Sequence, residues 1–298
     1  MHLSFPYGKK FLEIDIPEER LEGVLLSKLH DYRAPMGPSE LIADAMEKPI
    51  GSPKLSELAV GKKKVVLIAS DHTRPVPSKM IVPKMLYEIR RGNPNAEVTI
   101  LIATGCHRGT SRKELIQKFG ETIVQTENIV VHDCDNSPIT YVGVLPSGGE
   151  CWINSLVMQA DLVIAEGFIE PHFFAGFSGA RKSVLPGVAS RSTVLANHCS
   201  EFIADSYSRT GVLEGNPIHQ DMVWAARKAK LAFIVNVVIN ANKEAVFAVA
   251  GDMEQAHRTG CDFLNGLCCV CAKPADIVIT TNGGYPLDQN IYQAVKGM

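Results

Sequence analysis

The chain has 298 residues, of which 46% are hydrophobic and 21% are charged, a composition typical of a soluble globular protein. Its 30 basic and 32 acidic residues give a net charge of −2, which speaks against a nucleic-acid partner or an anionic membrane surface. No segment reaches the roughly 18 continuous apolar residues of a membrane helix. Residues 1–10 contain no apolar signal core, so we expect a cytoplasmic protein.

The first elements predicted along the chain are a hairpin that turns at residues 7–9 and a strand buried on both faces at 65–69. A helix over 83–91, with Pro83 at its first position, and a strand over 98–103 follow. Ser111 and Glu114 have the spacing of a capping box and open the next helix. This alternation of strand and helix predicts a parallel α/β sheet.

Later residues continue the pattern. Further strands are expected at 139–144, 162–165, 233–239, 246–249 and 277–280, and helices at 191–198, 221–230, 253–267 and 287–296. The fold class predicted is therefore α/β, with a Rossmann-like, largely parallel sheet. Cys268, Cys269 and Cys271 resemble a metal cluster, but their place between a helix and a strand favours small buried hydrophobic residues in a reducing compartment.

Polar clusters follow four of the predicted strands, at residues 70–75, 104–109, 166–174 and 281–286. Any one histidine among them is compatible with an ordinary loop residue. In open α/β sheets, however, ligands bind beyond the carboxyl ends of the strands. Four clusters at equivalent strand ends therefore predict one converging site.

A glycine-rich segment covers residues 176–187 and offers donors for an anion such as phosphate. It is not a Walker A loop, because Ala180 and Arg181 occupy the places of the required glycine and lysine. Composition alone leaves open whether it is a phosphate cradle or an ordinary loop. In the last helix, Gln289, Gln293 and Lys296 share one face, either as part of a site or as a solvated polar surface.

Four long motifs resemble those of the nickel-dependent lactate racemase family, and they occur in the same order. They are DHTRP at 71–75, GCHR at 105–108, EPHFFAGFSGARK at 170–182 and NGGYPLDQN at 282–290. The resemblance implies an isomerase that inverts the Cα of a small 2-hydroxy acid, lactate or a related acid. Inversion in this family proceeds by hydride transfer to and from a nickel-pincer nucleotide.

The resemblance also implies roles for the cofactor-binding residues. Lys182 would attach the pyridinium-3,5-bisthiocarboxylic acid mononucleotide covalently, and His198 would ligate nickel, which suits imidazole and soft sulfur donors. Asp71 and Thr73 would position cofactor or catalytic groups. Donors for the cofactor phosphate would come from Ser178, Gly179, Arg181 and Ser183.

The catalytic pair implied by the resemblance is His107 and His172, which would act as acid and base on opposite sides of the substrate. The substrate carboxylate would meet Arg74 and Lys296. Tyr292 and Gln293 would line the pocket. Dedicated biosynthesis and loading proteins would supply the cofactor.

Two features depart from the family pattern. Ala180 replaces an expected glycine, which is harmless if its φ is negative. Family members continue into a second domain, so we expect residues 1–272 to form the cofactor-binding α/β domain and residues 273–298 the truncated start of another. An alternative function is therefore a cofactor-binding module without catalysis. The sequence has neither the dinucleotide fingerprint of NAD-dependent dehydrogenases nor the H-E-x-x-H zinc motif of hydrolases.

Overall fold

The computed structural model describes residues 1–289 and 291. A six-stranded sheet forms its centre, in the order β12-β11-β8-β3-β4-β5. Neighbouring strands are parallel except β12, which is antiparallel to β11. The strands are β3 (Lys64–Ser70), β4 (Glu97–Ala103), β5 (Asn128–Val131), β8 (Leu162–Phe168), β11 (Leu231–Ile239) and β12 (Ala245–Gly251).

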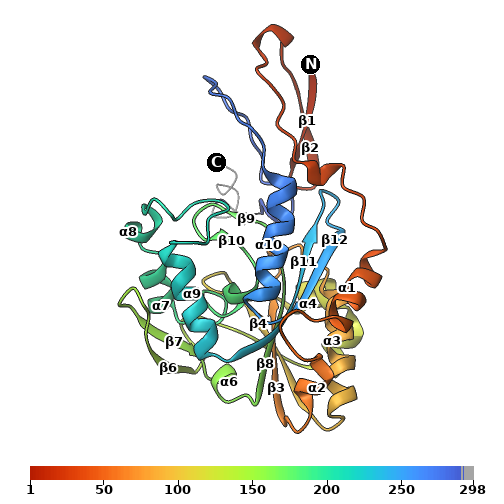
Figure 1. Cartoon of the computed structure of the whole chain (residues 1–298), viewed down its shortest axis with the longest axis vertical. Coiled ribbons are helices and arrows are strands. Elements are labelled where there is room, and N and C mark those ends of the chain that lie inside the picture. The colour runs from red at the N-terminus through yellow and green to blue at the C-terminus, as the bar shows by residue number, and fades with distance from the viewer. Residues whose placement is uncertain (290, 292–298) are drawn as a thin grey trace.

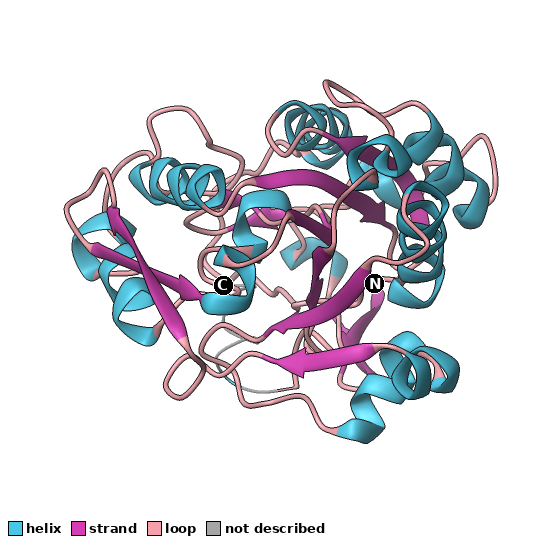
Figure 2. Ribbon diagram, turned by 90° about the horizontal axis from the view of Figure 1, so that it is seen from below, coloured by secondary structure: helices cyan, strands magenta, loops and turns pink. Residues whose placement is uncertain are grey.

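Helices cover both faces of this sheet, as Figures 1 and 2 show. The faces alternate along β3, because successive side chains of a strand point to opposite sides. Val65 and Leu67 pack into one core, with α1 (Pro38–Glu47), α2 (Leu55–Ala59), α3 (Ser78–Gly92) and α4 (Arg112–Phe119). Val66 and Ile68 pack into the other core, with α6 (Ser155–Met158), α7 (Arg191–Asn197), α9 (Pro217–Lys228) and α10 (Gln255–Cys268). The predicted α/β class with a largely parallel sheet is confirmed.

Smaller elements complete the chain. The predicted hairpin is present as β1 (His2–Tyr7) and β2 (Lys10–Asp15). Two further antiparallel pairs are β6 (Ile139–Val144) with β7 (Glu150–Asn154) and β9 (Pro171–His172) with β10 (Gly176–Phe177). The remaining helical segments are α5 (Glu121–Thr126), α8 (Ser200–Ile203) and the 3-10 turns η1 (Glu18–Arg20), η2 (Lys28–His30) and η3 (Ala180–Ser183).

Three expectations about local structure are wrong. Pro83 lies inside α3 rather than at its start, because the amphipathic pattern begins five residues earlier. Residues 277–280 form no strand: no neighbouring strand pairs with them, and their apolar side chains are exposed. Cys269 and Cys271 are exposed and Cys268 is half-buried, because they follow the last buried turn of α10 instead of entering the core.

The segment after residue 280 lies against the tip of the β1–β2 hairpin. The backbone N–H of Gly8 donates to Oδ2 of Asp288 at 2.6 Å, and the N–H of Tyr285 donates to the Gly8 carbonyl at 2.8 Å. The helix expected at 287–296 lies largely outside the described residues. Within the described part of the chain, no helix is both long and apolar enough to cross a bilayer.

Candidate active site

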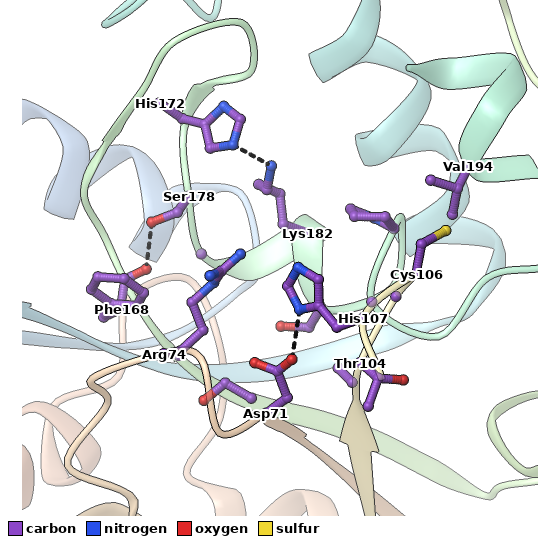
Figure 3. Close-up of a pocket in the computed structure, with 18 of the residues that line it drawn as sticks. Asp71, Arg74, Thr104, Cys106, His107, Phe168, His172, Ser178, Lys182 and Val194 are labelled. Atoms are coloured by element: carbon purple, nitrogen blue, oxygen red, sulfur yellow. Dashed lines mark hydrogen bonds and ion pairs between the residues drawn. The ribbon is translucent and has the colours of Figure 1, made fainter. Parts of the chain in front are cut away.

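A cavity of about 130 Å³ opens at the carboxyl edge of the sheet (Figure 3). The ends of β3, β4 and β8 line it, together with the glycine-rich segment after β10 and the end of α7. Three of the four predicted polar clusters therefore meet at one site. Of the described lining residues, none comes from the fourth cluster at 281–286, which lies on the hairpin instead. The functional residues on the cavity wall are Asp71, Arg74, His107, Glu166, His172, Ser178, Gly179, Lys182, Ser183 and His198.

Asp71 and His107 form a hydrogen-bonded pair across two strand ends. Oδ2 of Asp71 lies 2.6 Å from Nδ1 of His107, while its Oδ1 accepts from the hydroxyl of Thr73 at 2.6 Å. Burial opposes ionisation of Asp71, but the hydrogen bond from His107 and the charges of His107 and Arg74 outweigh it and lower the Asp71 pKa to about 2. The ionised carboxylate therefore fixes the orientation of His107 and leaves Nε2 to exchange protons. Thr73 is buried behind Asp71 and supports it.

His172 and Lys182 form the second contact in the cavity. Nε2 of His172 is 3.2 Å from Nζ of Lys182, and Nδ1 of His172 accepts from the backbone N–H of Ala175 at 3.3 Å. The imidazole also packs edge-on against Phe174, with the ring centres 4.6 Å apart. Only 8% of the surface of His172 is exposed, so these neighbours fix its place. Figure 3 shows this pair and the Asp71–His107 pair bordering the same cavity.

The backbone of the glycine-rich segment carries three residues with positive φ, namely Gly176, Gly179 and Ala180. Gly179 has a φ of +87°, and a Cβ there would lie 2.7 Å from Oδ1 of Asn236. Ala180 has a φ of +43°, so the condition of a negative φ, under which this alanine would be harmless, is not met. The reason is a hydrogen bond: the N–H of Ala180 donates to the same Asn236 oxygen at 2.8 Å, which holds the turn in place.

Arg181 does not face the cavity, which corrects its expected role as a phosphate donor. Its guanidinium is fully buried and donates to the carbonyls of Ala175, Ser178 and Gly179 at 2.9–3.3 Å. Its Nε donates to Nδ1 of His219 at 3.0 Å. Burial lowers the Arg181 pKa to about 10. The guanidinium thus braces the loop from behind and does not line the cavity.

Ser178 is also committed to the loop. Its hydroxyl donates to the Phe168 carbonyl and accepts from the N–H of Glu170, both at 2.9 Å. Gly179 and Ser183 also border the cavity. Of the four expected phosphate donors, these two are therefore the ones positioned for a ligand.

His198 ends α7 and borders the cavity together with Lys182 and His172. Its ring centre is 4.9 Å from that of Phe174, with the planes at 85°. A neutral imidazole on this cavity is a donor that suits a nickel ion together with soft sulfur ligands. The expected substrate residues Tyr292, Gln293 and Lys296 lie outside the described residues.

Glu166 is a cavity residue that sequence reasoning did not select. It lies in β8, is 1% exposed, and accepts from the N–H and hydroxyl of Ser70 at 2.8 and 2.7 Å. The hydroxyl of Ser78 donates to its other oxygen at 3.2 Å. The signal in the sequence that could have identified Glu166 is an acidic residue placed directly after the apolar run of a predicted strand. His132, His219 and His257, which belong to none of the four motifs, are hydrogen-bonded to protein groups and do not border the cavity.

Comparison with known proteins assigns the class and the family. The model of the lactate racemase N-terminal domain matches residues 7–211, and that of the lactate racemase C-terminal domain matches residues 270–298. A lactate racemase from Thermoanaerobacterium thermosaccharolyticum is 58% identical over all 298 residues, which correspond to 70% of that protein. One from Lactiplantibacillus plantarum is 53% identical over 99% of this chain and 70% of its own length.

Solved structures agree. The lactate racemase apoprotein from Thermoanaerobacterium thermosaccharolyticum superimposes with a TM-score of 0.92 at 57% identity, over the whole of this chain and 70% of that one. A Thermotoga maritima protein at 24% identity and a TM-score of 0.62, over 79% of this chain and 61% of its own, shares the fold. The fold and the site thus define an α/β enzyme of the isomerase class. The chain belongs to the lactate racemase family.

Proposed function

We propose that this protein inverts the Cα configuration of a small 2-hydroxy acid, lactate or a close relative. The observation that carries the proposal is the placement of two histidines on one cavity from different elements: His107 follows β4, and His172 lies in β9. Inversion needs an acid/base group on each side of the reacting carbon, and histidine can serve in both directions near neutral pH. The high identity to two lactate racemases supports this substrate class.

In this proposal each histidine removes the 2-hydroxyl proton of one enantiomer and returns a proton to the other. Arg74 lines the cavity and offers a planar fork of donors to the substrate carboxylate. Asp71 holds His107 in one orientation through their hydrogen bond. Lys296, Tyr292 and Gln293 remain family-implied substrate contacts.

The proposed cofactor is a nickel-pincer nucleotide, held by Lys182 through a covalent bond and by His198 through nickel. When bound, this cofactor accepts a hydride from the substrate and returns it. Among the chain's own residues, Gly179 and Ser183 face the ligand, whereas Arg181 and Ser178 hold the loop that presents Lys182. Asp71 and Thr73 position His107 rather than reaching the cofactor themselves. Separate proteins would make and load the cofactor, in the cytoplasm.

We also propose that the chain divides near residue 272. Helix α10 ends at Cys268, and residues 269–280 form no regular element and are largely exposed. Residues 1–272 would then form the cofactor-binding domain and residues 273–298 a part of a second one. A binding module without catalysis remains the second candidate, but its named relatives are both enzymes.

The test is to express the chain with cofactor-making proteins and to measure its intact mass, nickel content and inversion of chiral 2-hydroxy acids. We expect a mass adduct with one nickel, both lost in Lys182→Ala and retained in Lys113→Ala, which changes an exposed lysine of α4. Inversion of at least one acid supports the racemase. An adduct with nickel but no inversion across the panel, in a chain extended to the length of its relatives, would favour the binding module.

A further inference from the structure

Lys118 lies outside the four motifs, yet its side chain reaches the loop that carries Arg74. It occupies the last turn of α4, and its Nζ donates to the backbone carbonyl of Arg74 at 3.1 Å, across 44 positions of the chain. A lysine of an amphipathic helix usually extends its amine into water. The contact with a loop at the cavity edge therefore calls for an explanation.

Helix α4 gives this contact a rigid base. Ser111 and Glu114 close a capping box at the start of the helix, and Leu115 and Phe119 pack into the core that includes one face of β3. Phe119, the next residue after Lys118, is only 2% exposed. Lys118 is half-buried, so its side chain leaves the helix from a fixed point and passes under the loop.

The amine of Lys118 lies among the charged groups that border the cavity. Burial lowers the pKa of Lys118, the carboxylates of Glu166 and Asp71 oppose this shift, and the charge of Arg74 adds to it. The contact with the Arg74 carbonyl is the same in either protonation state, because an ammonium and a neutral amine both carry N–H donors. The contact is therefore a permanent part of the site.

Arg74 is held at a second point, at the far end of its side chain. Its Nη1 donates to the hydroxyl oxygen of Thr73 at 3.0 Å, and that hydroxyl donates to Oδ1 of Asp71 at 2.6 Å. Figure 3 shows Arg74 extending from this loop into the cavity. Lys118 thus holds the backbone of a residue whose guanidinium is oriented separately by Thr73.

We propose that Lys118 is a positioning residue for Arg74 and fixes the backbone from which the guanidinium reaches the substrate carboxylate. The inference rests on the proposed contact between Arg74 and that carboxylate. A long side chain binds a ligand well only if its backbone is already held in place, because freedom that is lost on binding weakens the complex. Lys118 does not line the cavity, so its effect on the substrate passes through Arg74.

Steady-state kinetics of the cofactor-loaded enzyme test the inference. Lys118→Met keeps the apolar stem and removes the donor, so we expect KM to rise about 10-fold while kcat stays within about twofold of the wild type. Lys118→Arg supplies a donor again and should bring KM to within about threefold of the wild type. Lys113→Met changes an exposed lysine of the same helix and should leave both constants unchanged.

Two kinetic results would overturn the inference. The first is an unchanged KM in Lys118→Met when Arg74→Gln raises KM, and the second is a loss confined to kcat. Nickel content would be measured for every variant, and the constants expressed per bound nickel.

A double-mutant cycle assigns the effect to Arg74. If Lys118 acts through Arg74, then Lys118→Met should cause no further loss of kcat/KM in a chain that already carries Arg74→Gln. Additive losses would show that Lys118 acts on another part of the site and would also contradict the inference.

Hydrogen–deuterium exchange of the unloaded full chain needs neither cofactor nor activity. The N–H groups of Thr73 and Arg74 are bonded to Asp71 within the loop, so residues 71–77 should exchange about 10-fold faster in Lys118→Met, with β3 and α4 unchanged. Lys118→Arg should restore the slower exchange. Equal exchange of the loop in wild type and Lys118→Met would overturn the inference. Faster exchange throughout the chain would overturn it as well, because the lysine would then stabilise the fold as a whole.

Failure of the inference can be distinguished from failure of the proposed function. An unchanged KM in both Arg74→Gln and Lys118→Met would contradict the proposed contact of Arg74 with the substrate, and the exchange of residues 71–77 would still show whether Lys118 holds the loop. Normal inversion with a raised KM in Arg74→Gln alone would contradict only the role of Lys118.

Discussion

Oδ2 of Asp71 and Nδ1 of His107 are 2.6 Å apart, although the two residues are separated by 36 positions in the chain. The parallel pairing of β3 with β4 brings them together, because Ser70 lies opposite Ala103 and each polar loop leaves the sheet from that point. The second histidine, His172, contacts a backbone N–H and an amine. The two proposed acid/base groups are therefore held differently.

The carboxylate of Asp71 should matter for turnover more than for stability. Asp71→Asn keeps the size of the side chain but removes the carboxylate that orients His107, so we expect kcat to fall by about 10²–10⁴-fold. Steady-state kinetics of the cofactor-loaded enzyme would measure this, with circular dichroism to verify the fold. Glu47→Gln, an exposed site on α1, is the control. An unchanged kcat in Asp71→Asn would contradict a role for the pair.

The buried guanidinium of Arg181 should matter for stability. Arg181→Met removes one hydrogen-bond donor from each of the carbonyls of Ala175, Ser178 and Gly179, which should lower the free energy of unfolding by about 2–4 kcal/mol. Arg181→Lys should lower the free energy of unfolding by a smaller amount. Urea unfolding gives both values. Arg191→Met, which breaks an exposed ion pair with Asp135, should cost less than about 1 kcal/mol. Equal losses at the two arginines would refute the bracing role.

His219 should make stability depend on pH. Burial, together with the charge of Arg181, lowers the His219 pKa to about 3, whereas the unfolded chain binds this proton near pH 6.5. Below pH 6.5 the unfolded state therefore holds more protons, and stability falls with falling pH by up to about 1.4 kcal/mol per pH unit from this site. Urea unfolding between pH 7.5 and 4.5 should show a shallower slope for His219→Gln than for the wild type. Identical slopes would argue against the shift.

The left-handed backbone of Ala180 leads to a further stability prediction. A φ of +43° costs an alanine about 1 kcal/mol, and its fully buried methyl group contributes about 0.8 kcal/mol. Ala180→Gly removes both the backbone strain and the buried methyl group, and these two effects nearly cancel. The free energy of unfolding of this variant should therefore stay within about 0.5 kcal/mol of the wild type. Ala180→Val adds a β-branched side chain at the same φ and should lose more than about 2 kcal/mol. Similar values for the two variants would contradict the strained conformation.

The parts of the fold that could be predicted are those with a strong local signal. The apolar runs at 65–69 and 98–103 lie inside β3 and β4, and the Ser111–Glu114 capping box opens α4. Pro83 was misplaced because a favourable position for proline does not exclude another tolerated one. Residues 277–280 have the apolar pattern of a strand, but a strand also needs a partner, which its own sequence cannot supply.

The loops that form the site could be predicted from the sequence more readily than the directions in which their side chains point. Residues 71, 107, 172, 182 and 198 meet at one cavity because parallel strands end at the same edge of a sheet. Arg181 and Lys182 are adjacent cations in the sequence, yet one is buried behind the loop and the other borders the cavity. Composition cannot distinguish these orientations, since each depends on carbonyls and histidines contributed by distant residues.

The unequal surroundings of the two histidines have a kinetic consequence for a racemase. Two enantiomers have the same free energy in water, so the equilibrium constant between them is one whatever the enzyme does. His107 lies beside a carboxylate, whereas His172 lies beside an amine. The two histidines are therefore expected to accept a proton at different rates. The kcat values for the two directions are therefore expected to differ, and the two KM values must then differ by the same ratio. An enzyme whose two acid/base histidines have different surroundings would therefore be saturated at different concentrations of the two mirror-image substrates.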